Sequence, residues 1–145
     1  MTDFFITNNT DRQRAHIAID DQFPPFKMSI SKGSKRSIEQ NRLMWMWMKE
    51  ASEQLKEYTA TEYQAYCKLH FGIPILRGED EGFKDAYDDV LKHLTYEQKL
   101  RAMSPPLDFP VTRLMKTGQL TRFLDDVYDH FKGLNVWLTE PDNED

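Results

Sequence analysis

The stretch KRSIEQNRLMWMWMKEASEQLKE, residues 35–57, contains the clearest helix pattern in the chain. Ser37 and Gln40 have the spacing of a capping box, in which two side chains satisfy free backbone N–H groups at a helix start. On a helical wheel of about 100° per residue, one narrow stripe is apolar. It consists of Met44, Met48, Ala51 and Leu55, with Trp47 at its edge. The pattern predicts a helix over 37–57 whose methionine-rich stripe faces the core.

A different face of this helix combines aromatic and basic side chains: Ile38, Asn41, Arg42, Trp45 and Lys49. Single-stranded nucleic acid is bound by cations along its backbone and by aromatic rings on which bases stack. Trp45 between Arg42 and Lys49 fits such a site. The same pattern also fits a tryptophan packed against a neighbouring element or a second subunit. Arg36 fits a solvated charge as well as a phosphate contact, and Gln40 fits a helix cap as well as a DNA contact.

The rest of the chain predicts an α+β fold, with short strands and several amphipathic helices in one compact domain over residues 1–138. Strands are expected at 4–6, at 26–30 with period-two alternation, and at 136–138; segments 73–76 and 109–115 are expected to be extended, and 78–82 to be a loop. Helices are expected from Thr10 or Asp11 to about 22 and from a Thr59 capping box to 71, with Gly72 as the stop. Three more are expected over 83–94, from a Thr95 capping box to before Pro105, and up to 133 with Thr117 as the cap. Gly33 and Ser34 are expected to form a turn. The acidic tail 139–145 is expected to be flexible.

Composition gives one domain of 145 residues with a net charge of −5 and a pI of about 5.4. An acidic protein is an unusual nucleic-acid binder, but the position of the charge decides. Residues 27–56 hold seven basic and three acidic residues, whereas 79–93 hold six acidic and two basic ones. One basic face on an acidic protein is therefore credible. A single cysteine, no apolar run of membrane length and no signal peptide predict a cytoplasmic protein.

Signals for catalysis are weak, so the sequence predicts a protein that is not an enzyme and needs no metal or cofactor. No glycine-rich phosphate loop is present. Cys67 and His70 form half of a zinc pattern without the other half. Asp125, Asp126 and Asp129 raise the alternative of a Mg²⁺-dependent nuclease, although their helical spacing places them on the outward face of the last helix.

The run Arg36-Ser37, Gln40-Asn41 and Trp45 resembles the phage lambda Orf (NinB) proteins and their prophage relatives of the YbcN type. The stretch Pro105–Met115, followed by Gly118-Gln119-Leu120 and Leu124–Val127, is similar to the YbcN branch. The resemblance covers roughly residues 3–138. It implies an α+β homodimer that binds single-stranded DNA without strict sequence preference. It further implies a mediator that helps load a strand-exchange protein on DNA coated by the host single-stranded-DNA-binding protein (SSB). The implied DNA contacts are Gln40, Arg42, Trp45 and Arg113.

Two functional hypotheses follow. In the first, the protein is a recombination mediator in which a set of cations contacts phosphates and Trp45 stacks on a base; the set is Arg36, Arg42, Lys49 and Arg113. In the second, the acidic surfaces of 79–93 and of the tail bind a basic protein partner without direct DNA binding. The nuclease, with Asp126 as a metal ligand, is a minor variant of the second.

Overall fold

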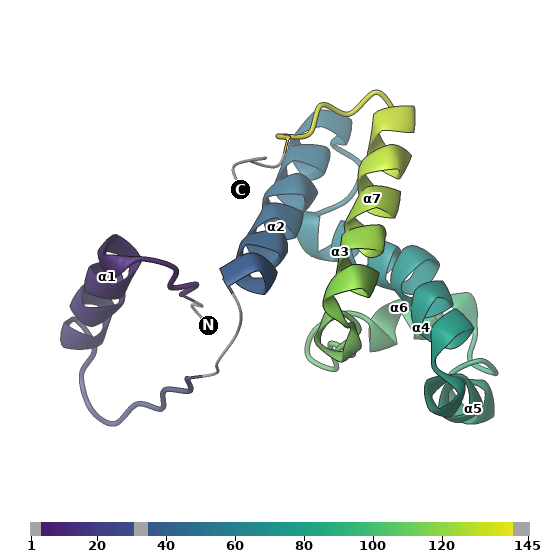
Figure 1. Ribbon diagram of the computed structural model, residues 1–145, viewed down its shortest axis with the longest axis horizontal. Helices are drawn as coiled ribbons and strands as arrows, with labels where there is room; N and C mark the ends of the chain where they lie inside the picture. The colour runs from purple at the N-terminus through teal and green to yellow at the C-terminus, as the bar shows by residue number, and fades with distance from the viewer. Residues whose placement is uncertain (1–3, 31–34, 141–145) are drawn as a thin grey trace. The chain divides into compact units, whose positions relative to one another are not determined.

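The computed structural model describes residues 4–30 and 35–140, with side chains described from residue 38 onward in the second range. These residues form helices joined by turns and extended segments, and none of them forms a β-strand (Figure 1). The described chain is all-α, so the predicted α+β class is wrong. The described residues divide into two compact units, one ending at Leu43 and the other beginning at Met44.

The first unit contains helix α1, Asn9–Asp20, which begins earlier than predicted. The Asn8 side chain caps it by accepting a 2.8 Å hydrogen bond from the Asp11 backbone N–H. The predicted strands at 4–6 and 26–30 do not form. Phe26, Met28 and Ile30 are 48%, 53% and 86% exposed. Alternation alone does not make a strand, because its backbone groups need a partner strand. The predicted turn at Gly33 and Ser34 lies outside the described residues.

Helix α2, Lys35–Leu55, contributes to both units. The predicted core stripe is confirmed for Met44, Met48 and Ala51, which are at most 1% exposed, whereas Leu55 is only half-buried. The predicted capping box is wrong in position. The helix begins two residues before Ser37, which therefore lies inside the first turn and not at the N-cap.

Helix α3, Ala60–Cys67, begins at the predicted Thr59–Glu62 capping box. It continues through a π-helical turn, η1 (Lys68–Gly72), into α4, Ile73–Glu79. Gly72 was expected to end the helix and 73–76 to be extended, and both expectations are wrong. Pro74 lies at the start of α4 directly after the π turn, in which the backbone N–H of Ile73 bonds to the Lys68 carbonyl five residues earlier. Helix α3, the π turn and α4 therefore form one continuous helical run.

The predicted loop 78–82 is also wrong, because Asp80 caps a new helix, α5 (Glu81–Val90). Helix α6, Tyr96–Ala102, begins at the predicted Thr95 capping box. The predicted extended segment 109–115 contains a 3₁₀ turn, η2 (Thr112–Leu114). Helix α7, Thr117–Gly133, is capped at Lys116 and not at Thr117.

The core of the second unit is built from α2, α7 and the helical run between them. The predicted apolar stripe of α7 is confirmed, because all of its members are buried: Leu120, Phe123, Leu124, Val127 and Phe131. A further buried cluster contains Ala65, Ile73, Leu76, Tyr87, Met103 and Val111. Trp47 of α2 packs on Tyr128 of α7, with ring centroids 5.5 Å apart.

The chain after α7 returns to α2 as an extended segment and not as the predicted strand at 136–138 (Figure 1). Val136 and Leu138 are buried, while Trp137 between them is 87% exposed. The residues of the predicted acidic tail from 141 onward lie outside the described chain.

Candidate functional site

The outward face of α2 presents two of the predicted DNA-binding side chains together. Trp45 is 37% exposed, and Lys49 lies one helical turn further and is also exposed. Residues four apart on a helix are neighbours on its surface. In the described part of the chain, neither side chain takes part in a hydrogen bond, an ion pair or a ring contact. The indole face and the ammonium group are therefore both available to a ligand.

Arg42 has a different environment from the one that the sequence predicted. Its guanidinium donates a 2.6 Å hydrogen bond to the Phe5 carbonyl oxygen and lies 3.5 Å from the Asp11 carboxylate. A hydrogen bond from the Thr7 backbone N–H lowers the pKa of Asp11 most, and the Thr7 hydroxyl and Arg42 lower it further. Arg42 thus helps to hold the chain before α1 in the first unit. Arg42 could bind a phosphate only if its contacts with Phe5 and Asp11 were broken.

The remaining predicted contacts are less informative. Gln40 is half-buried on α2, and the side chain of Arg36 is not among those that the structure describes. Arg113 is exposed on η2, and no described hydrogen bond, ion pair or ring contact joins it to α2. The structure therefore brings Trp45 and Lys49 together, engages Arg42 elsewhere, and leaves Arg113 on a separate element.

The acidic region 79–93 is partly neutralised from within the protein. Arg122 of α7 donates to both Glu79 oxygens, at 2.5 and 2.6 Å, and this contact lowers the pKa of Glu79. Arg77 forms a two-point contact with Asp88, at 2.9 and 3.0 Å. Two of the six acidic side chains are therefore paired with arginines, which weakens the case for a surface that binds a basic partner.

The residues that suggested a zinc site or a Mg²⁺-dependent nuclease do not form a metal site in the described chain. Asp125, Asp126 and Asp129 are exposed along α7. Among the described residues, no group of three histidine, cysteine or carboxylate side chains could hold a metal ion. Cys67 is completely buried, and this burial raises the pKa of its thiol to about 12. None of the described helices is long and apolar enough to cross a membrane.

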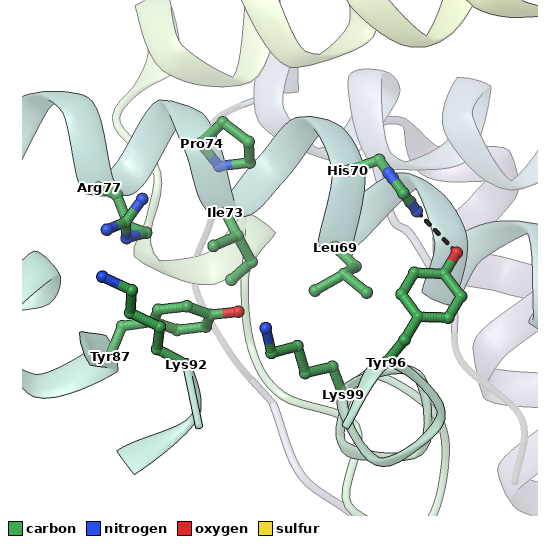
Figure 2. Close-up of a pocket in the computed structure, with 9 residues that line it drawn as sticks. All are labelled: Leu69, His70, Ile73, Pro74, Arg77, Tyr87, Lys92, Tyr96 and Lys99. Carbon is green, nitrogen blue, oxygen red and sulfur yellow. Dashed lines mark hydrogen bonds between the residues drawn. The ribbon is translucent and has the colours of Figure 1, made fainter. Parts of the chain in front are cut away.

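A pocket that sequence reasoning missed opens between η1, α4, α5 and α6, with a volume of about 330 Å³ (Figure 2). Its apolar part consists of Leu69, Ile73 and Pro74. Tyr87 contributes a ring that is itself only 7% exposed. These residues come from segments that the sequence indicated as a helix end, an extended piece and a separate helix. No local pattern therefore pointed to the pocket.

The polar part of the pocket is cationic. Arg77, Lys92 and Lys99 line it, and no carboxylate side chain does. In Figure 2 the two lysine side chains extend toward α4, and the Tyr87 hydroxyl points into the space between them. The Arg77 guanidinium lies 5.8 Å from the centroid of the Tyr87 ring, which together with Asp88 fixes its orientation.

One end of the pocket is closed by a histidine and a tyrosine. His70 Nε2 and the Tyr96 hydroxyl lie 2.8 Å apart (Figure 2). The His70 ring stacks on Tyr66, with centroids 4.1 Å apart. Burial lowers the pKa of His70, so the imidazole is neutral at pH 7. The pocket therefore carries its positive charge on Arg77, Lys92 and Lys99.

Comparison with models of known protein families gave no match, and comparisons with curated proteins and with solved structures gave none either. The resemblance of the Arg36–Trp45 run to the Orf (NinB) and YbcN proteins thus rests on that motif and on the 105–127 stretch.

Proposed function

We propose that the protein binds single-stranded DNA through the outward face of α2, with Trp45 stacking on a base and Lys49 contacting a phosphate. The observation that carries this proposal is the exposed indole of Trp45 beside the unengaged ammonium of Lys49. A flat aromatic face suits any base, and a nearby cation suits the backbone, so this pair favours binding without strict sequence preference.

The wider proposal is a recombination mediator that helps load a strand-exchange protein on SSB-coated DNA and acts as a homodimer in the cytoplasm. It is supported by the motif resemblance alone. Arg36 and Arg113 are the further candidate phosphate contacts, and Gln40 is a candidate polar contact. Arg42 belongs to this set only where DNA displaces it from Asp11 and Phe5.

The proposal is tested by fluorescence anisotropy of a labelled oligothymidylate at several salt concentrations. Affinity should fall steeply with salt, because binding releases counterions from the strand. Trp45→Ala should cost about 1–3 kcal/mol of binding free energy, the contribution of one base–aromatic stack, and Trp45→Phe should retain most of it. Lys49→Gln should reduce the slope of log affinity against log salt by roughly 0.7, the value for one single-strand phosphate contact.

Two matched controls isolate the α2 face. Trp137→Ala removes a tryptophan that is 87% exposed but lies on the C-terminal segment. Lys84→Gln removes an exposed lysine on α5. Both variants should bind like the unaltered protein. Absence of binding at low salt, or equal affinity for the Trp45→Ala variant, would refute the proposal.

A further inference from the structure

The pocket between α4, α5 and α6 has an excess of positive charge that the protein itself does not neutralise. Of its three cationic side chains, Arg77 is paired with Asp88, so the net charge of these four groups is +2. In the described chain Lys92 and Lys99 form no ion pair. A phosphate monoester has a charge of about −1.5 to −2 at pH 7, which matches this excess.

The same pocket offers a surface for a ring or another apolar group. Leu69, Ile73 and Pro74 lie along one side, and the buried Tyr87 ring lies along another (Figure 2). A volume of about 330 Å³ lies at the small end of the range for ligand sites, roughly 300–1,000 Å³. That size suits one small ligand with a charged end and an apolar end.

Part of the site is held in place before any ligand arrives. Asp88 accepts two hydrogen bonds from the Arg77 guanidinium, and the guanidinium also makes a cation–π contact with the Tyr87 ring. A cation that is already oriented loses little conformational freedom when it binds, which favours affinity. The contact with Asp88 uses Nε and Nη2 of Arg77, so the Nη1 donors remain for a phosphate oxygen.

We propose that this pocket binds a phosphate monoester attached to a ring-bearing group, with Lys92, Lys99 and Arg77 on the phosphate and Tyr87 with the α4 residues on the ring. Two sources supply this chemistry, a free nucleoside 5′-monophosphate and the 5′-phosphorylated end of a DNA strand. The inference is independent of the DNA-binding role proposed for α2, because it uses none of the same residues.

Isothermal titration calorimetry of the whole protein with thymidine 5′-monophosphate at low salt is the direct test. We expect one site per chain, with thymidine and inorganic phosphate each binding at least tenfold more weakly, since each lacks one half of the ligand. A 5′-phosphorylated thymidine dinucleotide that binds as tightly as the monophosphate identifies the strand end as the source. A dinucleotide that does not bind, beside a monophosphate that does, identifies the free nucleotide.

The double variant Lys92→Gln/Lys99→Gln should lower the affinity for thymidine 5′-monophosphate by roughly tenfold or more, because charge-assisted hydrogen bonds are lost. Lys92 is exposed and Lys99 is half-buried, and neither side chain forms a described hydrogen bond or ion pair, so the variant should fold, which circular dichroism checks. Lys84→Gln, which removes a lysine outside the pocket, should leave this affinity unchanged. Lack of binding at millimolar monophosphate, an unchanged affinity in the double variant, or equal binding of inorganic phosphate would overturn the proposal.

Discussion

The indole Nε1–H of Trp47 donates a 2.6 Å hydrogen bond to the carbonyl oxygen of Thr139, 92 residues later in the chain. Glu50 accepts two hydrogen bonds from Thr139, and Gln54 exchanges two with the backbone of Trp137. Three side chains of α2 thus satisfy the backbone of the C-terminal segment. They take the place of the partner strand that residues 136–138 would need for a sheet.

Trp47→Phe should destabilise the second unit. The substitution removes the donor to Thr139 and leaves a smaller ring at a position that is 2% exposed. Together these effects should lower the free energy of unfolding by roughly 1–2 kcal/mol, measured by urea denaturation. Trp137→Phe, at a site that is 87% exposed, is the matched control and should change stability by less than about 0.5 kcal/mol. Equal midpoints for the two variants would contradict the structural role of Trp47.

Lys68 is a buried cation with a structural function. It is 3% exposed, and its Nζ donates to the Met103 carbonyl at 2.8 Å and to Asp108 at 2.9 Å. Lys68→Met should lower the free energy of unfolding by about 1–3 kcal/mol, because the Met103 carbonyl loses its donor. Asp108→Asn should cost less, since the amide oxygen still accepts from Lys68 and asparagine tolerates the positive φ of 45° at this position. The reverse order of the two unfolding midpoints would rule this explanation out.

The helices that sequence reasoning predicted well are those whose signals are local. The capping boxes at Thr59 and Thr95 involve residues three apart, and the stripe of α7 needs only its own spacing. The wheel of α2 also separated Met44 and Met48 from Trp45 correctly. In each case, the residues that stabilise the structure lie within a few helical turns of one another in the sequence.

The strands failed because their stability depends on a partner that alternation cannot reveal. Helix α4 was missed because Gly72 and Pro74 usually end helices, whereas here a π turn and tertiary packing override that preference. The candidate sites show the same division. The wheel placed Trp45 away from the core stripe but left its exposure open, and the pairing of Arg42 with Asp11 spans 31 residues. The cationic pocket draws on four elements, so no single stretch of sequence predicts it.

Two histidines should make stability depend on pH. Burial lowers the pKa of both His70 and His130 from the ordinary value of 6.5, and His70 lowers that of His130 further. The unfolded chain therefore binds more protons than the folded chain near and below pH 6.5. Their contribution to stability is present above that pH and is lost as the pH falls through it. Urea midpoints should decrease between pH 8 and pH 5.5.

The double variant His70→Gln/His130→Gln should flatten this decrease, because the two imidazoles no longer take up protons on unfolding. His93→Gln is the matched control, since His93 is exposed on the turn after α5. Its pH dependence should follow that of the unaltered protein. A slope that persists in the double variant would show that other groups are responsible.

Cys67 should be inert in the folded protein. The thiolate is the reactive form of cysteine, and burial both hides this thiol and raises its pKa to about 12. Labelling with a thiol-reactive disulfide should therefore proceed only as fast as the protein opens, and should become rapid in denaturant. The variant Cys67→Ala/Thr61→Cys, which moves the thiol to an exposed position of α3, should react rapidly without denaturant. Fast labelling of Cys67 under native conditions would contradict the burial of this site.

Gly72 is required by the packing of η1 and not by its backbone angles. A Cβ built on it would collide with Cγ1 of Val111, a residue that is completely buried. Gly72→Ala should therefore lower the free energy of unfolding by about 1–3 kcal/mol, the usual cost of overpacking. Gly118→Ala on α7, where nothing lies within 4 Å of the new methyl group, should instead gain up to about 1 kcal/mol from helix propensity. A double-mutant cycle with Val111→Ala should show that the two residues are coupled, because truncating Val111 removes the collision. Additive effects of Gly72→Ala and Val111→Ala would exclude that contact as the cause.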